Sequence, residues 1–236
     1  MLFRSVDVNA ACKKTNAPEG ALYIDDGTIG TKGFPTIDYT PRVVGSYQPD
    51  WQGGIRNTLT LFRNLTLSGL VDIRRGGQAW DGTRGALYAY GTHRDTQIRG
   101  DKRVFGPSAG GTAGYYTSGP VAGPGVGTVV TIDQDWFQGD GGAFGDQGAQ
   151  FMEDASYVKL REVAIAYTLT QPFVRDRLGL TSINVRVAGR NLHTWTNYQG
   201  IDPESNLAGP AGYIQGFDWF NNPQTRSMVL SVGLNR

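Results

Sequence analysis

The chain has 236 residues and a formal net charge of +1, and 18% of its residues are charged, fewer than the roughly 25% of soluble domains. This balance gives no sign of the concentrated basic face that nucleic-acid binding requires, so no nucleic-acid partner is expected. The 34 glycines, 11 prolines and 11% aromatic residues are typical of an all-β protein with many turns and long loops. The sequence has no apolar run of about 18 residues for a transmembrane helix, and its start lacks the apolar core of a secretory signal.

Alternation of apolar and polar residues predicts five β-strands. The first two form a hairpin with a tight turn at residues 63–65. The strands have roughly the 9–11 residues that a tilted strand needs to cross a bilayer, whereas strands of about 5–6 residues are commoner in soluble proteins. The five predicted strands are residues 55–62, 66–74, 156–169, 182–195 and 225–236.

Each predicted strand has one apolar face and one polar face. In the fourth strand, for example, Ile183, Val185 and Val187 alternate with Asn184 and Arg186. Because side chains of a strand point to opposite faces in turn, this pattern places apolar groups on one side of the sheet and polar groups on the other.

The third predicted strand does not keep one phase. Val163, Ile165 and Tyr167 lie on its apolar face, but the same phase also places Lys159 and Arg161 there. Two explanations are open. Either the two cations lie above the hydrocarbon, or a β-bulge resets the alternation.

The connections between the strands alternate between short and long. Outer-membrane barrels are built in this way, with short periplasmic turns and long outer loops. Loops of this length are uncommon in compact soluble domains. The short connections are residues 63–65 and 170–181, and the long ones are residues 75–155 and 196–224.

This alternation gives each strand a direction across a membrane. The strand that ends at Arg74 rises to the outside, and Tyr167 and Trp195 then lie near opposite interfaces, where aromatic girdles belong. Five strands cannot close a barrel, since about eight is the practical minimum. We therefore expect further strands to complete the sheet.

Four segments resemble a known family. The segment SYQPDWQGGIRNTLTLFRNLTLSGLVDIRRGGQAWD is similar to a stretch of SusC/RagA-type TonB-linked outer-membrane proteins, which reads Asn-Pro-Asp-Trp-x-Gly-Gly, a hairpin and an Arg-x-Gly-Gly turn. Later motifs of that family are resembled by DASYVKLREVAIAYTL, GRNLHTWTNYQGIDPESN and NNPQTRSMVLSVGLNR, in the family's order. Two departures are Asn222, where the family usually has an aromatic residue before Pro223, and the missing final Phe.

The resemblance implies an all-β fold, in which antiparallel strands form the C-terminal part of a large transmembrane β-barrel of about 22 strands. It implies about five spanning strands with long extracellular loops in residues 53–236, whereas residues 1–52 are a poorly assigned outer-side or loop segment. The implied function is that of a nutrient importer in the bacterial outer membrane, which takes up glycans, oligosaccharides or peptides. The expected partners are a SusD-like surface lipoprotein, outer-membrane lipid, and the TonB-ExbB-ExbD complex through an N-terminal part that this chain lacks.

Five charged residues are expected to face the lumen of such a barrel. They could contact the plug or guide a polar solute, because lumen residues tune selectivity. The alternative is that they are solvated or ion-paired wall residues. These residues are Arg56, Asp72, Arg74, Arg186 and Arg190.

One long loop gathers carboxylates and aromatic rings. Asp133, Asp135 and Asp140 are closely spaced oxygen ligands and weak candidates for a calcium site, although the loop lacks the Glu of an EF-hand. We therefore expect no cofactor apart from this possible Ca²⁺. Trp136 and Phe137 could stack on a sugar ring or on the lipoprotein, and a plain polar loop is the alternative.

The last long loop carries a second aromatic pair. Trp219 and Phe220 are candidates for the same contacts, with the partner slightly favoured over the substrate. Asp202-Pro203-Glu204 earlier in that loop is a mark of the resembled family, and Pro203 most simply fixes a turn.

The sequence contains no pattern typical of an enzyme. Its two histidines, His93 and His193, are far apart, and no HExxH motif is present. We therefore expect no catalytic residues and no enzymatic activity. The competing hypothesis to a transporter is a soluble β-sandwich that acts as a glycan-binding or structural module.

Overall fold

The computed structural model describes residues 2–4, 22–28, 30–36, 41–43, 45–105, 121–139, 141, 149–209 and 214–236. The chain divides into two compact units, which we call the sheet unit and the loop unit. The sheet unit comprises Tyr47–Gln78, Asp154–Ser205 and Asn222–Arg236, and the loop unit comprises Met1–Ser46, Ala79–Glu153 and Asn206–Asn221. The predicted division between residues 52 and 53 stays a prediction.

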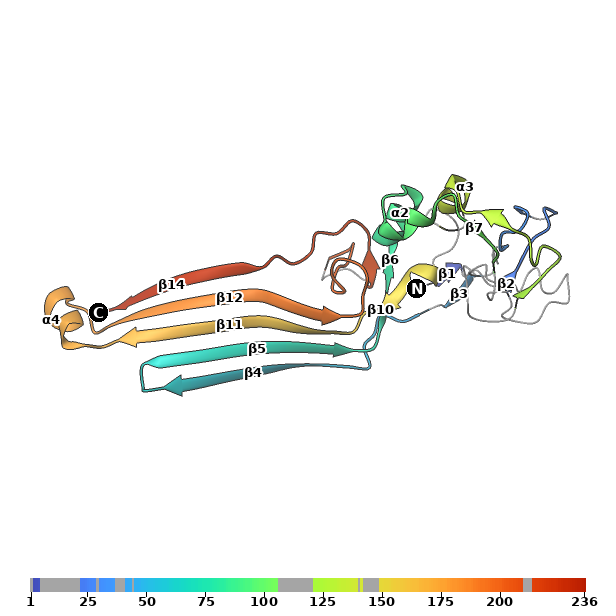
Figure 1. Ribbon diagram of the computed structural model, residues 1–236. Coiled ribbons are helices and arrows are strands. Elements are labelled where there is room, and N and C mark those ends of the chain that lie inside the picture. The colour runs from blue at the N-terminus through green and yellow to red at the C-terminus, as the bar shows by residue number, and fades with distance from the viewer. Residues whose placement is uncertain are drawn as a thin grey trace. The chain divides into compact units, whose positions relative to one another are not determined.

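The sheet unit is built on one antiparallel five-stranded sheet in the order β14-β12-β11-β5-β4 (Figure 1). This confirms the five predicted strands. Among the described residues of this unit no second sheet packs on the first, whereas a sandwich needs two packed sheets. The strands are β4 (Trp51–Leu61), β5 (Leu65–Arg75), β11 (Tyr157–Leu169), β12 (Ser182–Thr196) and β14 (Ser227–Asn235).

The turn of the β4–β5 hairpin lies one residue earlier than predicted. β4 ends at Leu61 and β5 begins at Leu65, so residues 62–64 form the turn. Phe62 and Arg63 both have positive φ, of 49° and 65°, a backbone conformation whose twist matches that of the flanking strands. Phe and Arg at these two positions do not indicate such a turn, because residues with positive φ in hairpin turns are usually Asn or Gly.

The phase problem in β11 is resolved by a β-bulge, the second of the two explanations offered above. The pairing register shifts between Leu160 and Glu162 on both sides of β11. Lys159 lies opposite Asp72 and Glu162 opposite Leu70, so Lys159 and Glu162 share the polar face. Arg161, the extra residue, reaches an Asp72 carboxylate oxygen on that face at 2.6 Å.

The short connection between β11 and β12 contains a helix that the sequence analysis did not predict. This helix, α4 (Pro172–Leu178), starts with a proline at its first turn and ends at Gly179, which has a φ of 63°. Val174 is its buried residue. Within the described ranges, no helix is long and apolar enough to cross a membrane.

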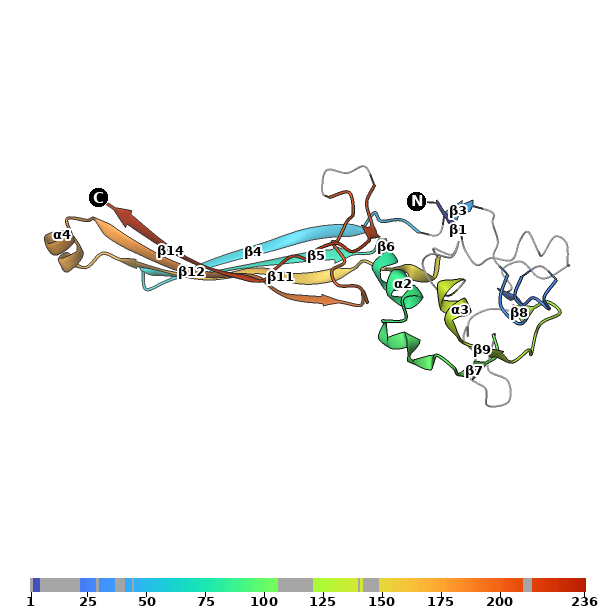
Figure 2. The same ribbon diagram turned by 90° about the horizontal axis from the view of Figure 1, so that it is seen from above.

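The loop unit is made of short elements. A three-stranded sheet has the order β10-β6-β13, and a further pair is β2–β8. Two more pairs, β1–β3 and β7–β9, can be seen in Figure 2. Its helices are α2 (Gly82–Ala89), α3 (Gln134–Gln138) and the 3-10 turns η1 (Arg94–Ile98) and η2 (Ala149–Phe151). Its strands are β1 (Leu2–Arg4), β2 (Leu22–Tyr23), β3 (Pro41–Val43), β6 (Gln78–Asp81), β7 (Lys102–Arg103), β8 (Val121–Ala122), β9 (Val130–Thr131), β10 (Met152–Asp154) and β13 (Phe217–Asp218).

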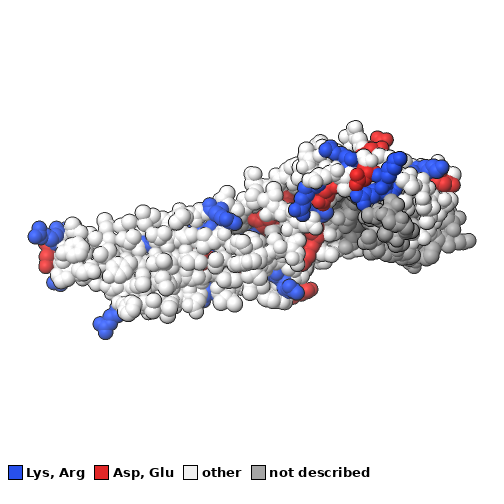
Figure 3. All heavy atoms as spheres, in the orientation of Figure 1, with Lys and Arg blue, Asp and Glu red and all other residues white. Residues whose placement is uncertain are grey.

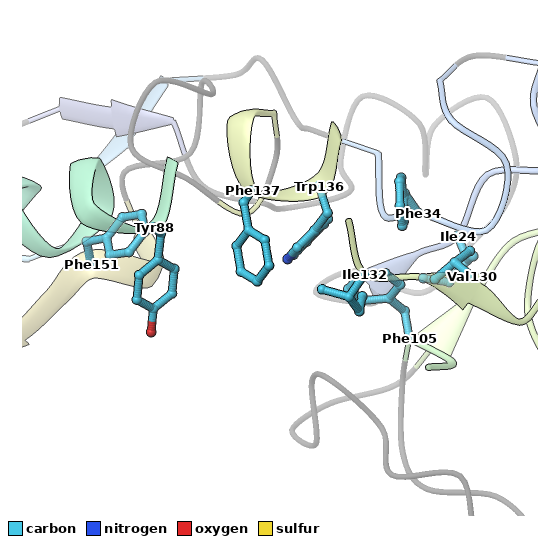
Figure 4. Packing of buried hydrophobic residues seen from close by; sticks show 9 residues of the cluster. All are labelled: Ile24, Phe34, Tyr88, Phe105, Val130, Ile132, Trp136, Phe137 and Phe151. Carbon is cyan, nitrogen blue, oxygen red and sulfur yellow. The ribbon is translucent and has the colours of Figure 1, made fainter. Parts of the chain in front are cut away.

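Aromatic rings form the core of the loop unit. Trp136 lies between Phe34 and Phe105, with ring centroids 5.4 and 4.6 Å away, and Tyr88 packs edge-on against Phe151 at 5.5 Å (Figure 4). Paired rings at such distances add to the stability that area burial provides. The long loops therefore have a hydrophobic core of their own, made of residues from the first and middle thirds of the chain.

Candidate functional site: a sheet with one apolar and one polar face

One face of the five-stranded sheet is apolar across its whole width. The pairing register aligns five side chains from the five strands in one row. Leu59, Ile165 and Leu230 of this row are 51%, 51% and 68% exposed. The row consists of Leu59, Leu67, Ile165, Val187 and Leu230.

This apolar face is too large for an ordinary water-exposed surface. Soluble monomers rarely expose contiguous apolar patches of more than a few hundred Å². By the register, Arg75 is the one Lys, Arg, Asp or Glu of the five strands on this face, and it lies at a strand end. Charged side chains are sparse over the strands near α4 on the side drawn in Figure 3. Such a face suits contact with hydrocarbon.

The opposite face carries a network of ion pairs. The Lys159 ammonium lies 2.7 Å from an Asp202 oxygen and 2.5 Å from a Glu204 oxygen. The Arg161 guanidinium lies 2.5 Å from Glu204 and 2.6 Å from Asp72. The Tyr157 hydroxyl donates to Glu204 at 2.8 Å. The network ties the Asp-Pro-Glu segment that follows β12 to β11 and β5.

Because these ion pairs are buried, losing one partner would cost folding free energy. Lys159 is 4% exposed and Asp202 is 8% exposed, so a missing partner would leave a charge out of reach of water. Burial opposes the ionisation of Glu204, but hydrogen bonds from Arg161 and Lys159 outweigh it and lower the pKa of this carboxyl to about 2. Glu204 is therefore ionised, and Pro203 lies between two anchored carboxylates.

The predicted lumen-facing arginines occupy three kinds of environment. Arg186 and Arg190 both pair with Glu162, at 2.6 and 3.2 Å. The Arg74 guanidinium is buried, lies 3.9 Å from the centre of the Tyr47 ring and donates to the Tyr47 carbonyl.

Arg56 differs from the other three arginines. It is exposed on the polar face of β4, opposite Leu70, and has no ion pair among the residues that the structure describes. Asp72, Arg186 and Arg190 form ion pairs, as expected if they are structural residues of the wall. That this face lines a lumen stays a prediction.

The acidic half of these networks was predicted only in part. Asp72 was expected on this face, but Glu162, Asp202 and Glu204 also supply carboxylates, and none of these three was expected as a site residue. One signal was present, because two cations out of phase in a strand require acidic partners. Which acids those are depends on a segment more than 40 positions away in the chain.

The aromatic candidates of the loop unit lie in different surroundings. Trp136 and Phe137 are 1% and 2% exposed and belong to the core. Stacking on a sugar or on the lipoprotein would require these rings to be exposed, and it stays a prediction. Trp219 stacks on Trp80, with centroids 5.5 Å apart and planes at 7°. Phe220 is 53% exposed and has a positive φ of 54°, so it is the candidate whose ring is accessible.

The acidic loop residues have local roles where they are described. The Asp133 side chain caps α3 by accepting from the backbone N–H groups of Asp135 and Trp136, at 3.1 and 3.4 Å. Asp140 lies outside the described residues. The described residues contain no group of three or more metal-ligating side chains of the His, Cys, Asp or Glu type.

A buried carboxylate pair lies in the small sheet of the loop unit. Asp81 of β6 lies opposite Asp218 of β13, and they are 0% and 2% exposed. Burial raises the pKa of Asp81 to about 7. A hydrogen bond from the Arg84 N–H acts against this rise, and the negative charges of Asp218 and Glu153 add to it. Asp81 thus titrates near neutral pH.

Comparison with known proteins shows which proteins this chain resembles. No family model matches the chain. Two TonB-dependent receptors of Formosa agariphila are similar to it. Receptor P3 is 32% identical over 90 residues, which is 36% of this chain and 9% of the receptor. Receptor P26 is 26% identical over 223 residues, which is 92% of this chain and 19% of the receptor. The chain thus spans a small part of these relatives.

Solved structures give the fold. The chain is similar to the RagAB peptide importer in its open-open state, with a TM-score of 0.51 and 15% identity, over 91% of this chain and 20% of that one. For the closed-closed state the TM-score is 0.52 and the identity 17%, over 90% of this chain and 20% of that one. These matches confirm the predicted fold of antiparallel strands from a large barrel. The chain is therefore similar to TonB-dependent receptors over most of its length, and it has the fold of part of the RagAB importer.

Proposed function

We propose that this chain forms part of the wall of an outer-membrane importer that takes up oligosaccharides or peptides. The observation that carries the proposal is the five-stranded sheet with one apolar face and one polar face. Hydrocarbon accepts the apolar face, and a watery lumen accepts the charges of the other. TonB-dependent receptors are outer-membrane proteins and transporters, so the family supports both location and transport and argues against an enzyme.

The ion pairs suit a wall that has to stay rigid while solute passes. Lys159 and Arg161 hold Asp202 and Glu204 against the polar face, so the start of the long connection after β12 is fixed to the barrel. Arg56 is exposed on that face and, unlike Arg190, has no ion pair with a described residue, so we assign it the contact with a plug or a passing anionic solute. The proposed energy source is the TonB-ExbB-ExbD complex, which acts on parts of the receptor outside this chain.

A surface lipoprotein of the SusD type is the proposed partner on the outside. Support comes from the loop unit, where Phe220 presents an exposed ring next to Trp219 and Trp80. Aromatic residues are enriched at protein interfaces. We assign Phe220 to the contact with this lipoprotein.

The test is uptake by cells that carry the full-length receptor. Deletion of the gene should abolish uptake of either labelled oligosaccharides or labelled peptides, and the plasmid-borne receptor should restore it. Phe220→Ser should weaken co-purification of the lipoprotein, whereas Phe62→Ser, which removes a still more exposed ring in the β4–β5 turn, should not. A full-length protein that is soluble and monomeric without detergent would overturn the proposal and favour the glycan-binding module.

A further inference from the structure

A groove crosses the apolar face of the sheet where the long connections leave the strands. Its volume is about 730 Å³. We call it the tryptophan groove and define it by five side chains on the apolar face: Trp51, Ile73, Arg75, Val158 and Trp195.

The pairing register places these five residues side by side. Trp51 of β4 lies opposite Arg75 of β5. Ile73 lies opposite Val158, and Val158 opposite Trp195. The four strands are consecutive neighbours in the sheet, so the two tryptophans are separated by three strand spacings, about 14 Å. The groove is therefore complete within this chain.

The groove has an apolar floor and aromatic sides. Trp51 and Trp195 are 52% and 53% exposed, and between them lie Ile73 and Val158. Tryptophan is enriched where hydrocarbon meets head groups, because its ring is apolar and its N–H is polar. A hydrocarbon chain on the floor and a polar head group above it would match this arrangement.

One cation adds a second requirement on the ligand. Arg75 is exposed, and its side chain has no ion pair or hydrogen bond with any residue that the structure describes. The acid that lines the groove, Asp154, already accepts from the Ser156 N–H and hydroxyl at 2.9 and 2.5 Å. An unpaired guanidinium at the edge of an apolar groove favours an anion, and its planar fork fits a phosphate group.

We propose that the tryptophan groove binds a phosphorylated glycolipid of the lipid A type, with its acyl chain on Ile73 and Val158 and its phosphate on Arg75. The inference rests on the proposed function and on the strand direction expected from the short and long connections, which together put this end of the sheet in the outer leaflet. There the long connections leave the strands, and the lipid of that leaflet carries both phosphate and sugar. The tryptophan rings would lie against the sugar, and a phospholipid would lack this contact.

The experiment uses the full-length receptor, purified in mild detergent and freed of lipid. Binding of lipid A, dephosphorylated lipid A and phosphatidylglycerol is measured by native mass spectrometry. Arg75→Gln should weaken lipid A binding about tenfold, as expected for the loss of one charge-assisted contact. Arg63→Gln, an exposed arginine in the turn at the other end of β5, is the matched control and should bind like the wild type.

Two further measurements test the sugar contact and the phosphate contact separately. Trp195→Leu should weaken binding of lipid A while leaving phosphatidylglycerol unchanged, and dephosphorylated lipid A should bind wild type and Arg75→Gln equally. If Arg75→Gln does not fold, Arg75→Lys keeps the charge and should show a smaller loss. Unchanged lipid A binding in Arg75→Gln, or equal binding of phosphatidylglycerol and lipid A to the wild type, would overturn the groove alone. Solubility without detergent would instead overturn the proposed function.

Discussion

Lys159 shows at the residue scale how this wall tolerates buried charge. It is 4% exposed and holds two carboxylates. An ammonium in this position is acceptable only because Asp202 and Glu204 provide both counter-charge and hydrogen bonds. The same interactions that neutralise it also anchor the connection after β12.

We expect Lys159→Met to destabilise the receptor by about 3 kcal/mol, because it leaves the buried Asp202 carboxylate without a counter-charge and leaves Glu204 with Arg161 alone. Arg226→Met is the control, since Arg226 is exposed. The measurement is the temperature at which the fast-migrating folded band is lost on electrophoresis. Equal temperatures for the two variants would show that the network does not contribute to stability.

Asp81 gives a prediction about pH. Its pKa is about 7 when folded and 3.8 ordinarily, so the folded state binds the proton more tightly than the unfolded state. The contribution of Asp81 to stability is therefore largest below about pH 4 and is lost as the pH rises to about 7. Asp81→Asn should remove this dependence, as measured by protease resistance of the loop unit. The same loss of resistance with rising pH in both proteins would contradict the assignment.

At the scale of elements, the turn that ends β5 depends on glycine. Gly77 has a φ of 81°, and a Cβ there would lie 2.6 Å from the Tyr47 carbonyl oxygen. Gly77→Ala should cost about 2 kcal/mol through backbone strain and this close contact. Gly54→Ala is the matched control, because the nearest atom to its Cβ would be 3.9 Å away. Similar denaturation midpoints for the two variants would refute the prediction.

Neighbouring residues of β4 separate the two faces of the sheet. Leu59 lies in the apolar row and Thr60 on the polar face, opposite Thr66. In phospholipid vesicles Leu59→Lys should cost about 2 kcal/mol of folding free energy, and Thr60→Lys well under about 1 kcal/mol. Denaturant titration of the vesicle-inserted receptor measures both. A larger cost at Thr60 would mean that the faces are assigned the wrong way round.

At the scale of the whole molecule, the sheet has two edges. β4 and β14 each have a strand partner on one side only among the described residues, and hydrocarbon does not tolerate unpaired backbone groups. We expect these 236 residues alone to aggregate on refolding in detergent, whereas the full-length receptor should give a monomer with heat-dependent mobility on electrophoresis. A stable, heat-modifiable monomer from the 236 residues would contradict this.

The strands and their faces could be predicted from the sequence because alternation is a local property. Ile183, Val185 and Val187 define one face whatever the strand pairs with, since successive side chains of any strand point to opposite sides. Strand length and the contrast between short and long connections then favoured a barrel over a sandwich. None of these features requires knowledge of a distant contact.

The tertiary structure alone decided the contacts between distant segments. Alternation left both explanations of Lys159 and Arg161 open, and the choice depended on Asp72, Asp202 and Glu204, which lie far away in the chain. Trp136 illustrates the same limit, because an aromatic residue in a polar loop has the same sequence pattern whether it packs on Phe105 or faces water. Composition and periodicity determine which groups a segment presents, but burial and charge pairing depend on which other segment arrives there.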